Sequence, residues 1–201
     1  MSKTYTDVIA EVNQRKQQLA QKCADLFVDN PSATLEIGCG HGHFLAAYAQ
    51  AHPETFCVGI DLVSKRIEKA NLKKTKQGID NLHLLKAEVS EFLDGLASAV
   101  VFQSIFMLFP DPWPKKRHHK NRMVQQGFLG AIAQHTHADS KFYFRTDDAG
   151  YFEWTCQHVA DNPFWELDPE AQWPFENESY FQNLMESWQS CIARRIPIAS
   201  C

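Results

Sequence analysis

The apolar positions of this chain repeat with two different periods, and segments of the two kinds alternate. Within residues 6–27 the apolar side chains recur every three or four positions, the period of a helix buried on one face. Short runs of consecutive apolar residues follow, each bounded by polar or glycine-containing turns, as expected of strands buried on both faces. The buried-strand candidates are ATLEIG, TFCVGID, LHLLKA, VVFQSIFMLF and KFYFRT.

Between these predicted strands, the apolar residues repeat with the period of a helix. We predict helices through FLAAYAQAH, over about 64–77, over about 89–96, over about 120–134 and through AGYFEWTCQHVAD. Alternating strands and helices are typical of a mostly parallel sheet covered by helices on both faces. Two later segments, WEL and SCIARRI, are predicted to close the sheet as an antiparallel pair. The predicted fold class is therefore α/β, Rossmann-like and doubly wound.

Composition and length favour one globular domain. The chain has 201 residues, of which 44% are hydrophobic and 22% charged, and we expect residues 1–201 to form a single domain with residues 1–30 as a helix packed on it. No run approaches the roughly 18 apolar residues of a membrane helix. The six cysteines are scattered without a C-x-x-C pair, which predicts free thiols in the cytoplasm. The histidines lack companion ligands at suitable spacing, so no metal site is predicted.

Charge is distributed unevenly along the chain. The net charge is -4, but no Asp or Glu occurs within 113–138. That stretch begins with five cations: Lys115, Lys116, Arg117, Lys120 and Arg122. A local positive face attracts phosphates even when the whole chain is acidic. A solvated helix end is the alternative explanation, and charge alone favours it.

The sequence LEIGCGHG ends the first predicted strand and opens a helix. Glycines there allow a tight turn and the close approach of a ligand, and ligands bind such sheets at the carboxyl ends of the strands. His43 stands where the dinucleotide fingerprint needs a glycine, so the spacing is G-x-G-x-G. Asp61 ends the second strand and could accept hydrogen bonds from both ribose hydroxyls of an adenosine. We therefore predict nucleoside binding, with a plain strand-to-helix turn as the alternative.

Two further strand ends carry acidic residues. Glu88 follows the third strand and could bind an adenine amino group, or simply cap the next helix. The fourth strand runs into FPDPWPKKRHHKNR, where Asp111 lies between two prolines that stiffen the backbone. Trp113 could stack on a base or pack against the following helix.

Four motifs, LEIGCGHG, GID, FPDPWPKKRHHKNR and FRTDDAGYFEW, together resemble the bacterial tRNA (guanine-N7-)-methyltransferase family. Their order and spacing cover about residues 35–154, and the F-P-D-P-W-x-K-x-R-H string is the most specific part. The resemblance implies a class I methyltransferase fold, S-adenosylmethionine as methyl donor and tRNA as partner. It also implies methyl transfer to N7 of guanosine 46 in the tRNA variable loop.

The resemblance implies a set of site residues by position. The cofactor-binding residues are predicted to be Glu36, Gly38, Gly40, Asp61, Glu88 and Asp111. Asp111 also takes the active-site position of the family. Guanine N7 has an in-plane lone pair and no proton, so we expect Asp111 to act through orientation and charge rather than as a base.

On the substrate side, Lys115 and Asp147 match tRNA-contacting positions of the family, and Arg117 is a candidate phosphate contact. The late T-x-x-E element of the family corresponds to Ser179 and Gln182, where an amide replaces the carboxylate. This departure leaves two rival functions open. One is methylation of an exocyclic amine or of a different RNA. The other is a non-catalytic paralogue that binds S-adenosylmethionine or RNA. No obligatory protein partner is implied, and the oligomeric state stays open.

Overall fold

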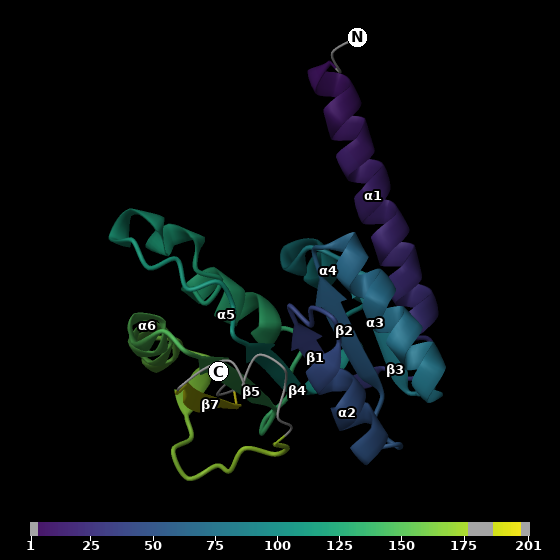
Figure 1. Cartoon of the computed structure of the whole chain (residues 1–201). Coiled ribbons are helices and arrows are strands. Elements are labelled where there is room, and N and C mark those ends of the chain that lie inside the picture. The colour runs from purple at the N-terminus through teal and green to yellow at the C-terminus, as the bar shows by residue number, and fades with distance from the viewer. Residues whose placement is uncertain (1–3, 177–186, 198–201) are drawn as a thin grey trace.

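One sheet of seven strands runs through the computed structural model, which describes residues 4–176 and 187–197 (Figure 1). The strands are β1 (Ser32–Ile37), β2 (Cys57–Asp61), β3 (Leu82–Lys86), β4 (Val101–Leu108), β5 (Lys141–Thr146), β6 (Trp165–Leu167) and β7 (Gln189–Arg195). Their order is β3-β2-β1-β4-β5-β7-β6. Strands β1 to β5 pair in parallel, whereas β7 is antiparallel to both β5 and β6. The strand order reverses between β1 and β4, which is where such sheets bind ligands.

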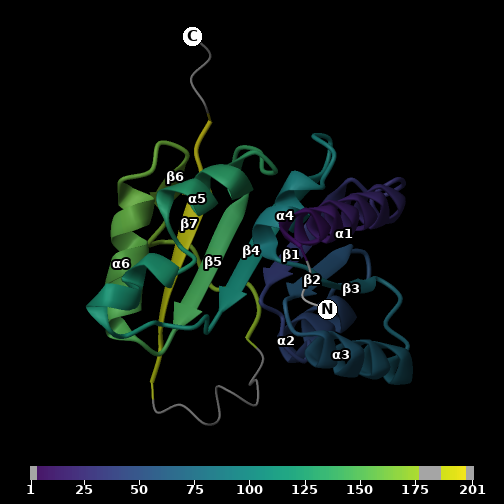
Figure 2. The same ribbon diagram turned by 90° about the horizontal axis from the view of Figure 1, so that it is seen from above.

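Helices cover both faces of this sheet. They are α1 (Tyr5–Leu26), α2 (His43–Ala51), α3 (Ser64–Gln77), α4 (Val89–Asp94), α5 (Gln126–Ala133) and α6 (Ala149–Ala160), with a 3-10 helix η1 (Lys116–Asn121) before α5. One apolar cluster joins the sheet to α1, α4, α5 and α6, and a second joins it to α2 and α3. Successive residues of β5 belong to different clusters, because side chains along a strand alternate between faces. Figure 2 shows α1 and α4 on one side of β1 and β2, and α2 and α3 on the other.

The predicted fold class is confirmed, including the closing antiparallel pair. The prediction of a helix over 120–134 was wrong at its start. Residues 116–121 form η1, Arg122 is extended, and α5 begins only at Gln126. The side chains of Arg122 and Val124 are both buried, at 2% and 0% exposure. An extended backbone turns both of these side chains inward, which a helix continuing from η1 would not do.

Helix α1 packs on the domain through its C-terminal half. Leu19, Cys23 and the following Phe27 are buried, whereas Tyr5 and Val8 in the first turns are 82% and 45% exposed. Figure 1 shows this first half extending beyond the rest of the molecule. Within the described residues, no helix combines the length and the apolar character that crossing a membrane requires.

Candidate active site

A cavity of about 370 Å³ lies at the carboxyl ends of β1, β4 and β5. This volume is in the usual range for a small-molecule site. Its walls come mainly from three segments that are far apart in the sequence, around the ends of these strands, because parallel strands all end at the same edge, and Arg66 of α3 adds to them. Five of the predicted site residues line it: Glu36, Gly38, Gly40, Asp111 and Asp147.

The loop after β1 forms one wall of the cavity. Gly38 and Gly40 adopt left-handed φ angles of 75° and 55°, which side chains other than glycine rarely adopt. A Cβ added at either position would meet no atom within 4 Å, so both glycines leave open space. Asp61, at the end of β2, holds this loop by accepting a hydrogen bond from the Gly40 N–H at 3.0 Å. Its other oxygen accepts from the Val63 N–H at 2.7 Å, so one buried carboxylate links the ends of two strands.

One carboxyl oxygen of Glu36 lacks a hydrogen-bond donor among the described residues. Its side chain is 4% exposed, and its Oε2 accepts no hydrogen bond within the described residues. Burial raises the pKa of Glu36 to about 8, with the nearby Asp61 carboxylate acting in the same direction. Because buried polar atoms are normally paired, an unpaired carboxyl oxygen lining a cavity fits a ligand that carries hydroxyl donors, such as a ribose.

The loop after β4 presents Asp111 from a strained backbone. The residues on either side of Pro110-Asp111-Pro112, Phe109 and Trp113, have left-handed φ angles of 49° and 48°. Such conformations cost on the order of 1–3 kcal/mol each and persist only where the surrounding structure holds them. The Phe109 N–H donates to the Arg145 carbonyl at 2.7 Å, which fixes the start of the loop against β5. Strain of this kind gathers at functional sites.

Arg145, the charged residue near the end of β5, completes the opposite wall. It is 4% exposed and donates two hydrogen bonds to the Glu176 carboxylate, at 2.9 and 3.0 Å. Its guanidinium also lies over the Trp173 ring, 4.0 Å from the centroid. Sequence reasoning did not single out Arg145, although a lone cation near the end of a buried strand was a usable signal.

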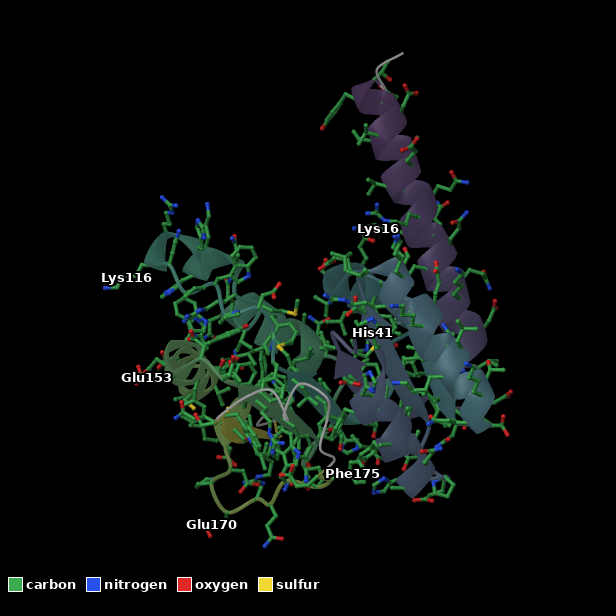
Figure 3. The ribbon with its side chains drawn as sticks, in the orientation of Figure 1. Lys16, His41, Lys116, Glu153, Glu170 and Phe175 are labelled. Carbon is green, nitrogen blue, oxygen red and sulfur yellow. The ribbon has the colours of Figure 1, made fainter. Side chains whose placement is uncertain are left out.

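The exposed cations follow the loop after β4 that lines the cavity. Lys115, Lys116, Arg117 and Lys120 are exposed on η1 or immediately before it. Figure 3 shows Lys116 at the outer tip of this projection. Arg122 is different, because its side chain is buried among protein groups, so its prediction as a phosphate contact was wrong.

Comparison with known proteins agrees with this geometry. A family model described as "Putative methyltransferase" matches residues 30–194. The tRNA (guanine-N(7)-)-methyltransferases of Rhodospirillum rubrum and Synechococcus sp. are 38% and 32% identical over 129 and 165 residues. These matches cover 64% and 82% of this chain. The chain belongs to the bacterial tRNA (guanine-N7-)-methyltransferase family. It spans about half to two thirds of the curated relatives, 50% and 67% of these two.

Solved structures share the fold at low sequence identity. The aminoglycoside resistance methyltransferase NpmB1 superimposes with a TM-score of 0.59 at 14% identity, over 88% of this chain and 93% of that one. The 16S rRNA (adenine(1408)-N(1))-methyltransferase of Catenulisporales acidiphilia gives 0.58 at 15% identity, over 90% and 93%. These similarities establish the class I methyltransferase architecture alone.

Three residues that the tRNA (guanine-N7-)-methyltransferase family implies lie away from the cavity or outside the described residues. Glu88 is the N-cap of α4, where its Oε2 accepts from the N–H groups of Ser90 and Glu91 at 2.9 and 3.1 Å. It does not line the cavity, and its contact with adenine stays a prediction. Ser179 and Gln182 lie outside the described residues. The described residues contain no group of His, Cys, Asp or Glu side chains suited to hold a metal ion.

Trp113, in the loop after β4, is partly packed and partly exposed. It contacts His118 of η1 edge to face, with 5.9 Å between ring centroids, and remains 36% exposed. It therefore packs against the following helix without being buried there. Stacking on a base stays a prediction.

Proposed function

We propose that this chain transfers a methyl group from S-adenosylmethionine to N7 of guanosine in tRNA, at position 46 of the variable loop. The observation that carries the proposal is the set of acidic groups around one cavity at the sheet edge. This cavity is lined by a Glu36 carboxyl with an unpaired oxygen and by two exposed carboxylates, Asp111 and Asp147, and the loop that carries Asp111 continues into a run of exposed cations. Family membership supports the same reaction.

In this proposal the donor lies against the loop after β1, which lines the cavity. Glu36 accepts hydrogen bonds from it, Gly38 and Gly40 leave room for it beside the backbone, and Asp61, which holds this loop from behind the lining residues, is a further proposed contact. When bound, S-adenosylmethionine supplies an electrophilic methyl group carried on a positively charged sulfur. Glu88 is the remaining proposed contact.

The chain's own contribution to the reaction is orientation and charge. Guanine N7 needs no deprotonation, so no residue has to act as a base. Asp111 faces the cavity from a rigid loop and stabilises the positive charge that develops on the purine. Asp147 accepts hydrogen bonds from the guanine N1–H and amino group, which selects the base. Lys115 and Arg117 contact phosphates, which supports affinity rather than base choice. Ser179 and Gln182 stay proposed substrate contacts.

We also propose that the enzyme works in the cytoplasm as one methyltransferase domain. Thiols stay reduced in that compartment. The cysteines of the described residues are all free: Cys23, Cys39, Cys57, Cys156 and Cys191.

The test is incubation with donor labelled in its methyl group and an unmodified tRNA transcript, followed by nucleoside analysis. We expect labelled 7-methylguanosine, and no transfer to a transcript with adenosine at position 46. A different methylated nucleoside would contradict the proposed base or atom. Binding of tRNA without transfer to any RNA would identify a non-catalytic paralogue.

Asp111 variants test the proposed chemistry. We expect Asp111→Ala to abolish methylation while tRNA affinity falls far less, and Asp111→Asn to lower kcat by about 100-fold, as for loss of one preorganised electrostatic group. Asp139→Asn is the matched control, because Asp139 is 76% exposed and the left-handed backbone there suits Asn. Equal losses in Asp111→Asn and Asp139→Asn would refute this role.

A further inference from the structure

Arg122 ends the basic run, but its guanidinium bonds to the protein from three sides. Its Nε donates to the Pro112 carbonyl at 2.8 Å, and one terminal nitrogen donates to the Gly150 carbonyl at 2.9 Å. The other terminal nitrogen lies 3.5 Å from the Asp148 carboxylate. The side chain is 2% exposed. Arg122 therefore joins the loop after β4 to the start of α6.

Aromatic rings of α6 hold this guanidinium in place. It lies over Tyr151 and Trp154, 4.9 and 5.4 Å from the two centroids. The Tyr151 hydroxyl accepts from the N–H groups of Met123 and Val124 at 3.0 and 3.3 Å. The Trp154 Nε1–H donates to the Val124 carbonyl at 2.7 Å. The backbone directly after Arg122 is thus hydrogen-bonded to α6, as the Arg122 side chain is.

The loop that presents Asp111 has few bonds of its own. Pro110 and Pro112 have no N–H to donate. Its start is fixed by the bond from the Phe109 N–H to β5, and its end by the bond from Arg122 to the Pro112 carbonyl. Both ends of the loop have left-handed backbones at non-glycine residues, which need external support to persist. Arg122 supplies this support at the second end.

We propose that Arg122 is a positioning residue that sets the Asp111 carboxylate relative to Asp147. Pro112 directly follows Asp111, and Asp148 directly follows Asp147, so one guanidinium holds the neighbours of both. An arginine is required because its planar fork donates in two directions while its face rests on the rings. A lysine ammonium would keep the charge but could not hold both carbonyls in this geometry.

The test is steady-state kinetics of Arg122→Lys, and it rests on the proposed function. We expect kcat to fall by about 10- to 100-fold, the effect of a small misplacement of a reacting group. The KM for tRNA and the salt dependence of tRNA binding should stay at wild-type values. A phosphate contact would behave oppositely, with a higher KM, a salt slope lower by about one and an unchanged kcat. That result, or a lowered Tm with an unchanged kcat, would overturn the proposal.

Arg194→Lys is the matched control. Arg194 also pairs with two carboxylates, Asp139 and Glu166, but it lies opposite Lys141 at the start of β5, away from the cavity. We expect its kcat to equal that of the wild type. A fall as large as that in Arg122→Lys would overturn the positioning role.

Absence of methyl transfer by the wild type would refute the proposed function but not the positioning role of Arg122. Hydrogen exchange tests that role without any activity measurement. In Arg122→Lys we expect faster amide exchange confined to residues 109–115 and 147–152. Unchanged exchange in these two segments, or equal acceleration throughout the chain, would overturn the inference.

Discussion

At the scale of single residues, the carboxylates at the strand ends differ in what surrounds them. Glu36 is buried with an unpaired oxygen, and Asp61 is buried with both oxygens bonded to backbone N–H groups. Asp111 and Asp147 are exposed beside the cavity. The environment therefore distinguishes one carboxyl whose pKa is raised by burial, one that holds a loop, and two that are exposed at the cavity.

The raised pKa of Glu36 leads to a prediction about stability and pH. Because its pKa is about 8 in the folded protein and 4.5 ordinarily, the folded state keeps a proton that the unfolded chain has released between these values. This contribution to stability is complete below pH 4.5 and is lost as pH rises to 8, by up to roughly 1.4 kcal/mol per pH unit. We expect Glu36→Gln, which cannot ionise, to match the wild-type Tm near pH 5 and exceed it at pH 8.

Calorimetry at several pH values from 5 to 8 checks this. Glu170→Gln is the control, because Glu170 is an exposed acid at the edge of the molecule (Figure 3). Its Tm should run parallel to that of the wild type. A Tm difference for Glu36→Gln that stays constant with pH would contradict the assignment.

At the scale of elements, η1 carries the exposed cations away from the sheet as a projection. We expect Lys115→Ala combined with Arg117→Ala to lower the salt slope of tRNA binding by up to about two. Each phosphate contact that is lost reduces the number of counterions released on binding. Titration of labelled tRNA at several salt concentrations measures the slope.

The control for that measurement is Lys22→Ala combined with Lys76→Ala. Both lysines are exposed and lie near the C-terminal ends of α1 and α3, which precede β1 and β3 and so lie at the opposite edge of the sheet. The same slope in both double variants would mean that the η1 cations form an ordinary solvated surface and do not contact tRNA phosphates.

Helix α1 divides into a packed half and an exposed half, which differ in their expected effect on stability. Leu19 is 7% exposed in the core, so Leu19→Ala should lower the free energy of unfolding by about 2–5 kcal/mol. Val8 is 45% exposed, so Val8→Ala should change it by less than about 0.5 kcal/mol. Urea unfolding of both variants measures the difference. Similar losses would mean that the first half of α1 is covered in solution.

At the scale of the whole molecule, the net charge of -4 hides a local arrangement. Two arginines near the cavity are directed inward, Arg122 toward α6 and Arg145 toward Glu176. The lysines of η1 and Arg117 remain outside. The exposed positive surface is therefore smaller than the basic run in the sequence, because Arg122 does not contribute to it.

Much of this architecture could be predicted from local patterns. The apolar runs located β1 to β5 to within a few residues, and WEL and SCIARRI were expected to pair. The insertion of β7 between β5 and β6 was not predicted, because strand order depends on contacts between distant residues. The helix predicted from 120 began late for the same reason, since the positions of Arg122 and Val124 are set by α6.

The sequence by itself determined the kinds of elements, the glycine turn, the proline-flanked Asp111 and the family. These depend on backbone preferences and short-range spacing, which act within a few residues. Only the tertiary structure decided which charges are usable. It buried Arg122 and Arg145 and left Glu36 with an unpaired oxygen in a cavity. Burial and hydrogen-bond partners come from segments far apart in the chain, so no local pattern contains them.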